Sequence, residues 1–158
     1  MFENTEEVTV ATEAGPNRER IALWVKELRN PDLVQANGIL AQSDKPDGPW
    51  RQCCLDVACR VAMDNGLELK EHIRVPSEGD PFYSRGYETG GDPDSYGEDV
   101  TYSILPPAVR DWYGFDSKWV GVKLGDQGWD ATVLNDDLRL TFSKIADAVE
   151  ATYLQDGK

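Results

Sequence analysis

Apolar residues recur with helical spacing near the start of the chain. Within residues 16–28 they follow an i, i+3, i+4, i+7 pattern, at Ile21, Trp24, Val25 and Leu28. This spacing predicts a helix with one buried face, which begins near Pro16 and ends before Pro31, because the residue before a proline avoids helical angles. A second, shorter pattern predicts another helix over residues 33–40, from Leu33, Ala36, Ile39 and Leu40.

Residues 50–65 are the most informative helical segment. Aliphatic residues and cysteines fill most of it, and polar side chains recur at every fourth position, at Gln52, Asp56, Arg60 and Asp64. The pattern predicts a helix that is buried on almost every side and turns one narrow polar stripe to water. Asp56 precedes Arg60 by four residues, the favourable order for a helical ion pair worth about 0.3–0.5 kcal/mol. We expect this helix at the centre of the fold.

The last helical pattern covers residues 141–154. Thr141 is placed to cap its N-terminus, and the apolar stripe comprises Phe142, Ile145, Ala146, Val149 and Tyr153. We expect this amphipathic helix to pack on the central one. A shorter helix is predicted to open at Pro106–Pro107 and to close at Gly114.

Alternating apolar residues predict short strands between these helices. The candidate strands are 67–75, 100–105 and the two arms of a hairpin, 119–124 and 129–134, around a turn at 125–128. Together the elements predict an α+β fold. We expect a flexible acidic N-terminus over residues 1–15, and a single compact domain over 16–158 with a central buried helix, a C-terminal amphipathic helix, a small antiparallel sheet and a long loop at 76–99.

The segment 76–99 differs in composition from the rest of the chain. It is rich in glycine, proline and acidic residues and holds several aromatic rings and a single basic residue, Arg85. Aromatic side chains in adaptable loops provide contact area with few rotors to freeze, and an arginine can anchor an acidic group of a partner. The alternative is that the rings cover the core. The predicted partner-binding residues are Phe82, Tyr83, Arg85, Tyr87, Asp92, Asp94 and Tyr96.

Charge excludes some classes of partner. The chain has 29 acidic residues against 16 Lys plus Arg, a net charge of −13 at pH 7. Binding to DNA or RNA needs clustered basic residues, so direct nucleic-acid binding is not expected, whereas mimicry of nucleic acid is compatible with the charge. No apolar run approaches the roughly 20 residues of a membrane span, and three cysteines do not make a disulfide framework, so we expect a cytoplasmic protein.

Candidate catalytic and metal-binding residues are few. Cys53, Cys54 and Cys59 point in different directions on a helix, which disfavours a zinc site with His72, and we expect them in the core rather than as nucleophiles. Residues 92–97 start like a calcium loop, but a bidentate glutamate is missing at its twelfth position. Residues 135–137, an asparagine and two aspartates, are typical of a structural turn. The sequence therefore predicts no catalytic residues, no metal and no cofactor.

Three segments together resemble a family of small uncharacterised proteins of actinobacteria and their phages. They are Trp50–Cys59, Leu105–Gly114, and Leu134–Asp136 followed by Thr141–Asp147, about a quarter of the chain. Relatives typically carry glycine where this chain has Asp56. The resemblance implies a cytoplasmic, phage-borne accessory protein and transfers no activity.

Three functions follow as hypotheses. The first is a noncatalytic phage accessory protein that binds and modulates a host protein. The second is an acidic nucleic-acid mimic that acts on a host DNA-binding or defence protein. The third is a small cysteine-dependent enzyme built on Cys53 or Cys54.

Overall fold

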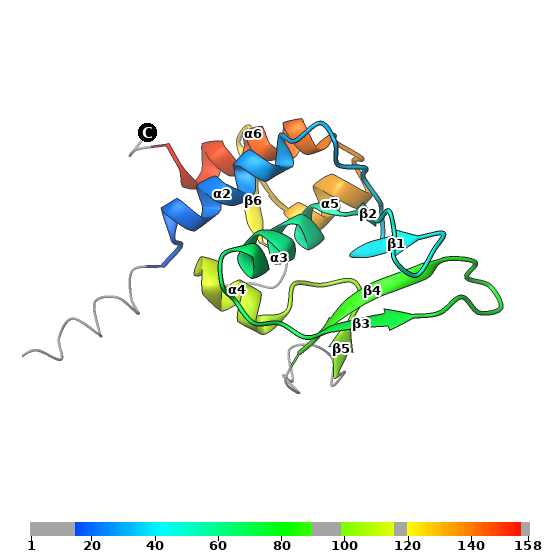
Figure 1. The fold of residues 1–158 in the computed structure, drawn as a ribbon. Coiled ribbons are helices and arrows are strands. Elements are labelled where there is room, and N and C mark those ends of the chain that lie inside the picture. Colours follow the sequence, from blue (N-terminus) through cyan, green and yellow to red (C-terminus); the bar gives the residue numbers. More distant parts are fainter. Residues whose placement is uncertain (1–14, 90–98, 116–119, 156–158) are drawn as a thin grey trace, which may run out of the picture.

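The computed structural model describes residues 15–89, 99–115 and 120–155, and confirms an α+β fold (Figure 1). The helices in these ranges are α2 (Arg18–Leu28), α3 (Cys54–Asp64), α4 (Pro107–Tyr113), α5 (Ala131–Asp136) and α6 (Phe142–Tyr153). The strands are β1 (Ala41–Ser43), β2 (Arg51–Gln52), β3 (Glu71–Arg74), β4 (Tyr83–Glu88), β5 (Val100–Thr101), β6 (Gly121–Leu124) and β7 (Gln127–Asp130).

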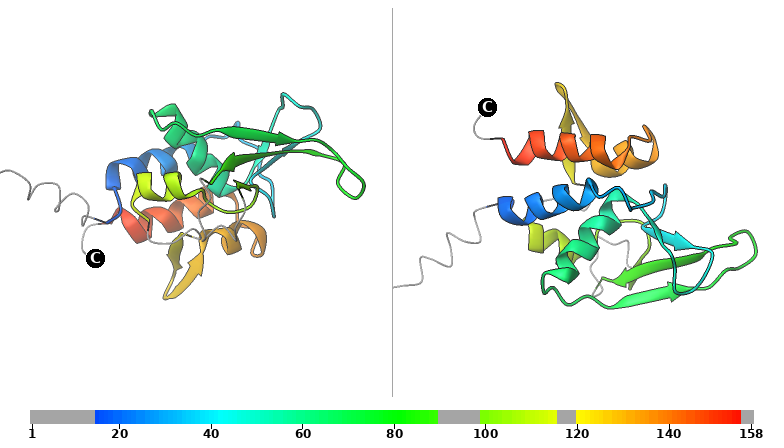
Figure 2. Two further views of the ribbon diagram at one scale, coloured as in Figure 1. Left: turned by 90° about the horizontal axis from the view of Figure 1, so that it is seen from below. Right: turned by 45° about the horizontal axis from the view of Figure 1, so that its top comes forward.

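Helix α2 lies between α3 and α6 (Figure 2). The Trp24 ring is fully buried, 5.9 Å from the rings of both Tyr113 and Phe115, and its indole nitrogen donates a 3.0 Å hydrogen bond to the Cys54 carbonyl. On the other side, Arg29 pairs with carboxylates of α6. The expectation that the C-terminal helix packs chiefly on the central helix is therefore wrong, because α2 separates them.

The larger sheet is antiparallel, in the order β2-β1-β4-β3, with β5 beside the far end of β4. Helix α3 lies over one face (Figure 1). Strand β4 is thus the centre of the sheet. Gly86 in β4 has no room for a side chain, because an added Cβ would collide with the Thr101 carbonyl and the Tyr102 ring.

The smaller sheet is the hairpin of β6 and β7, which leads directly into α5. The predicted strand 129–134 is therefore wrong after Asp130, where α5 begins. The hairpin is joined to α6 by hydrogen bonds from the Lys123 backbone N–H to the Thr152 hydroxyl, 2.8 Å, and from the Tyr153 hydroxyl to the Gly121 carbonyl, 2.5 Å.

The predicted helices at 106–113 and 141–154 are confirmed. Gly114 follows α4 with φ of 81°, a left-handed conformation that glycine adopts without strain. The Thr141 hydroxyl accepts from the Lys144 N–H at the start of α6. Both helix ends are set by local chemistry, which is why the sequence pattern located them.

The predicted helix at 33–40 is wrong. Its backbone groups bond to other segments of the chain: the Ala36 N–H donates to the Gln52 carbonyl of β2, 2.7 Å, and the Leu40 N–H to the carbonyl of Tyr102, which follows β5, 2.8 Å. Residues 51–52 likewise form β2 instead of the first turn of the central helix. Tertiary hydrogen bonds outweigh the apolar spacing in this segment.

The predicted loop at 76–99 is wrong over residues 83–88, which form β4. Arg85 and Tyr87 are buried there, so they cannot contact a partner as a loop surface would. Phe82 and Tyr83 are half-buried. Asp92, Asp94 and Tyr96 lie outside the described residues.

Candidate functional site

A buried carboxylate organises the contact between α3 and the sheet. Asp56 is fully buried, although the sequence pattern predicts its stripe in water. Its Oδ2 accepts from Gln52 Nε2 at 2.7 Å and from Arg85 Nη2 at 2.6 Å, and its Oδ1 accepts from the Tyr87 hydroxyl at 2.5 Å. The predicted pairing of Asp56 with Arg60 is wrong, since Arg60 instead binds Glu71 of β3 at 2.7 Å.

The backbone of β4 explains why two of the predicted residues meet at Asp56. Side chains alternate along a strand, so Arg85 and Tyr87 emerge on one face of the sheet, and α3 covers that face. Burial and the neighbouring Asp56 charge raise the pKa of Tyr87, which keeps its hydroxyl protonated as a donor. The cluster holds one compensated ion pair in the interior.

Arg85 retains unused hydrogen-bonding capacity. A guanidinium has five N–H donors, and within the described part of the chain this one makes a hydrogen bond only to Asp56. Its Nε is buried and has no hydrogen-bond partner in the ranges that the structure describes. The Trp50 ring lies 4.8 Å from the guanidinium carbon and covers one of its faces.

A pocket of about 280 Å³ opens beside this arginine, between α2, α3 and the sheet. Arg60, Asp64 and Val61 contribute from α3, Glu27 from α2, and Leu33 and Trp50 from connecting segments. None of these residues was singled out as a site in the sequence, because residues from such distant segments share no local pattern. The arrangement can bind a small polar group against a buried guanidinium.

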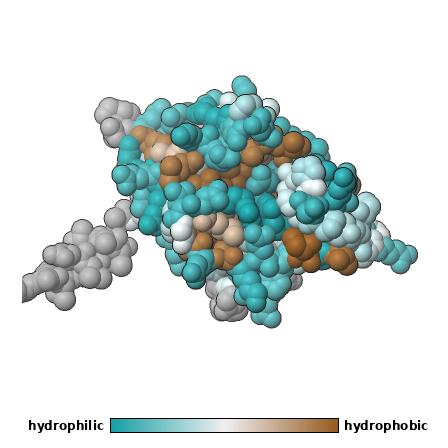
Figure 3. All heavy atoms as spheres, in the orientation of Figure 1, coloured by the Kyte–Doolittle hydropathy of each residue, from teal (hydrophilic) through white to brown (hydrophobic). Residues whose placement is uncertain are grey.

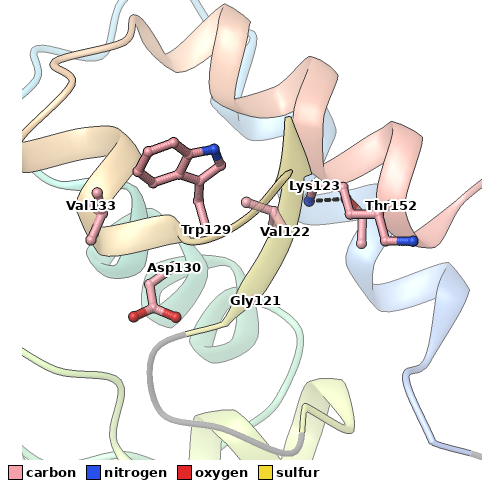
Figure 4. A pocket seen from close by; sticks show the side chains of 8 residues that line it. Gly121, Val122, Lys123, Trp129, Asp130, Val133 and Thr152 are labelled. Atoms are coloured by element: carbon pink, nitrogen blue, oxygen red, sulfur yellow. Dashed lines mark hydrogen bonds between the residues drawn. The ribbon is translucent and has the colours of Figure 1, made fainter. Parts of the chain in front are cut away.

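A second, larger groove of about 560 Å³ lies under the β6–β7 hairpin (Figure 4). Trp129, Val122 and Val133 give it an apolar wall, and Thr152 of α6 closes one side. The described residues place no unpartnered buried charge there. It therefore gives less indication of ligand chemistry than the Arg85 pocket.

The three cysteines are core residues in this structure. All are free and buried. Burial raises the pKa of the Cys53 thiol to about 12, and the neighbouring Asp56 charge adds a smaller effect in the same direction. Burial also raises the pKa values of the Cys54 and Cys59 thiols well above the usual range of a cysteine. His72 lies on β3 with its Nε2 2.8 Å from Glu88 Oε2, so among the described residues its side chain meets a carboxylate and not a thiol. These environments disfavour a thiolate nucleophile.

We expect stability to fall at alkaline pH for the same reason. The pKa of the Cys53 thiol is near 9 in the unfolded chain and about 12 in the folded protein. Below pH 9 its contribution to the free energy of unfolding is fully present, and it is lost as the pH rises toward about 12. Urea unfolding across this range should show a falling free energy of unfolding. Cys53→Ser should flatten the fall, and an unchanged pH dependence in that variant would contradict the assignment.

Asn135 has a structural role that the predicted turn only partly describes. It is fully buried near the end of α5, and its Oδ1 accepts from the Cys54 backbone N–H at 3.2 Å. Its Nδ2 donates to the Ala36 carbonyl at 2.8 Å. Cys53 offers no side-chain cap to α3, so Asn135 supplies one from a distant part of the chain.

Strand β3 forms an open edge of the large sheet. The Glu88 N–H donates to the Lys70 carbonyl, so Lys70 faces β4 with its backbone groups. In an antiparallel pair every second residue does the same, and the backbone groups of His72 and Arg74 therefore also point toward β4. Those of Glu71 and Ile73 point outward, and the described residues provide them with no backbone partner. Ile73 is 42% exposed and the following Val75 65%. Figure 3 shows hydrophobic atoms at the surface on the sheet side of the molecule as well as across the helices.

The described residues contain no group of three His, Cys, Asp or Glu side chains placed to hold a metal ion. Among the helices in these ranges, none has the length and apolar character needed to cross a bilayer. Comparisons with protein-family models, curated proteins and solved structures find no match.

Proposed function

We propose that this chain is a noncatalytic, phage-borne accessory protein that binds a host protein through β3. The observation that supports the proposal most directly is the open edge of that strand, where the backbone donors and acceptors of Glu71 and Ile73 have no backbone partner among the described residues. An extended segment of a partner can add to such an edge as a further antiparallel strand. This docking site replaces the loop surface expected from the sequence.

The chemistry of the edge and of the whole chain defines the partner segment. The exposed side chains of Ile73 and Val75 favour apolar contacts beside the added strand. The net charge of −13 attracts basic partners over long range and speeds their association. We therefore propose an extended, basic host segment with an apolar residue opposite Ile73.

Proline at position 73 tests the edge directly. The Ile73 N–H points away from β4, so Ile73→Pro removes an outward donor and adds a ring that obstructs a new strand, while the bonds to β4 remain. We expect this variant to lose about tenfold or more of its affinity for a partner, since 1.4 kcal/mol corresponds to tenfold. Affinity capture from an actinobacterial lysate, with quantitative mass spectrometry, measures the loss.

Ile73→Val is the matched control, because it keeps both the N–H and the branched apolar side chain. A partner retained equally by the proline and valine variants would show that β3 is not the docking site. The absence of any stoichiometric partner under cross-linking would contradict the binding function itself. Competition with DNA and a steep loss of binding with salt would instead favour the nucleic-acid mimic.

A further inference from the structure

The pocket beside Arg85 combines features that point to a particular ligand. Its most buried polar group is the Arg85 guanidinium, whose side chain is 7% exposed and whose Nε has no hydrogen-bond partner among the described residues. Buried donors in folded proteins are nearly always satisfied by protein or water. Nε itself is closed off from the pocket, but Nη1 makes no hydrogen bond to the described residues and is accessible, so an oxygen acceptor brought into the pocket can accept from Nη1.

The charges around the pocket disfavour a simple anion. The Arg85 charge is already compensated by Asp56, and that of Arg60 by Glu71. Two further carboxylates line the pocket, Glu27 and Asp64, and neither has an ion pair within the described ranges. The surroundings are therefore net negative, and they favour a ligand that also carries a positive charge.

The remaining wall is apolar. Leu33, Val61 and Trp50 also line the pocket. The volume of about 280 Å³ has room for roughly nine water-sized groups, at ~30 Å³ for each. A short hydrocarbon linker suits this wall.

We propose that the Arg85 pocket binds a small amino acid-like zwitterion. Its carboxylate accepts from the Arg85 guanidinium, its ammonium group lies near Glu27 and Asp64, and its hydrocarbon part contacts Trp50. The pocket is separate from the outward edge of β3, so this inference does not depend on the proposed partner binding.

A series of ω-amino acids tests the proposal and measures the spacing of the two charges. Glycine, 4-aminobutanoate and 6-aminohexanoate are titrated into the full chain, with hexanoate and hexylamine as ligands that each lack one charge. The side-chain Nε–H signal of Arg85, followed by nuclear magnetic resonance, reports on the guanidinium group whose Nη1 donates to the ligand. We expect a saturable shift with at least one amino acid, and binding about tenfold or more weaker for hexanoate and hexylamine.

The double variant Glu27→Gln, Asp64→Asn isolates the ammonium contact without altering the buried ion pair. We expect it to lose most of the preference for the amino acid over hexanoate. Asp126→Asn, an exposed change in the distant β6–β7 turn, is the matched control and should leave the preference intact.

Several results would overturn the proposal. One is an Arg85 Nε–H signal that no amino acid in the series shifts. Others are equal binding of hexanoate or hexylamine, and an unchanged preference in the Glu27→Gln, Asp64→Asn variant. Partner capture by the same variant tests the β3 edge independently, because neither substitution lies on that strand.

Discussion

Replacing Asp56 by alanine is expected to lower the free energy of unfolding by about 3–5 kcal/mol. The substitution leaves the Arg85 guanidinium buried without its counter-charge and removes the acceptor of the Tyr87 hydroxyl. A typical domain is stable by only about 5–15 kcal/mol, so the variant loses much of its stability. Urea unfolding followed by circular dichroism measures the change.

The same helix provides the control for this prediction. Asp64 lies two turns further along the polar stripe and is exposed, so Asp64→Ala should change stability by no more than about 0.5 kcal/mol. Asp56→Leu combined with Arg85→Met removes both buried charges and should be more stable than Asp56→Ala. Equal effects at positions 56 and 64 would mean that the ion pair is solvated.

Replacing Trp24 by alanine is the second large expected loss, about 3–5 kcal/mol. The ring is fully buried at the meeting point of α2, α3 and α4, and its indole nitrogen donates to the Cys54 carbonyl. Alanine leaves a cavity beside Tyr113 and Phe115 and removes the indole donor to the Cys54 carbonyl. The midpoint and slope of urea unfolding give the change in stability.

Two further variants separate the causes of that loss. Trp24→Phe removes the indole donor and part of the ring but keeps much of the packing, so it should cost considerably less than alanine. Trp129→Ala removes the same side chain from a partly exposed site on the hairpin and should also cost less. If Trp129→Ala destabilised the protein as much as Trp24→Ala, the core would be centred elsewhere.

Helix α3 follows the polar periodicity of the sequence only in part. The spacing of polar residues identified the helix, and Asp64 at its end does face water, but the predicted water-facing stripe is wrong at Gln52, which lies in β2, and at Asp56, which is buried. Periodicity carries no information about what covers the other end. Asp56 is covered by β4, whose Arg85 and Tyr87 lie 29 and 31 residues further along the chain.

Strand β4 was missed because its buried side chains are polar. A central strand usually contains apolar residues, whereas Arg85 and Ser84 are buried here beside Gly86. The alternation of Tyr83, Arg85 and Tyr87 was a signal of a strand, but the surrounding glycines and acids are typical of a loop. Pairing with β1, β3 and β5 supplies the stabilisation that the local sequence does not indicate.

The candidate sites were still harder to predict. Arg85 was identified as a residue that could meet an acidic group, and the structure gives it a buried carboxylate of the same chain. Trp50, Arg60 and Glu27 reach the pocket from separate elements, so their proximity depends on the tertiary fold. The open edge of β3 also depends on the tertiary fold, because it exists only if β3 is the last strand of the sheet. Short segments with weak alternation do not specify the order of strands in a sheet.

The pairing of α2 with α6 affects how the chain folds during synthesis. Arg29 contacts Asp147 and Glu150, which are 118 and 121 residues later in the sequence. At roughly 5–20 residues per second, a ribosome completes α6 on the order of ten seconds after α2. Throughout that interval the surface of α2 that α6 will cover stays open to other nascent segments and to chaperones, and the helical layer closes only once residues near 153 have emerged.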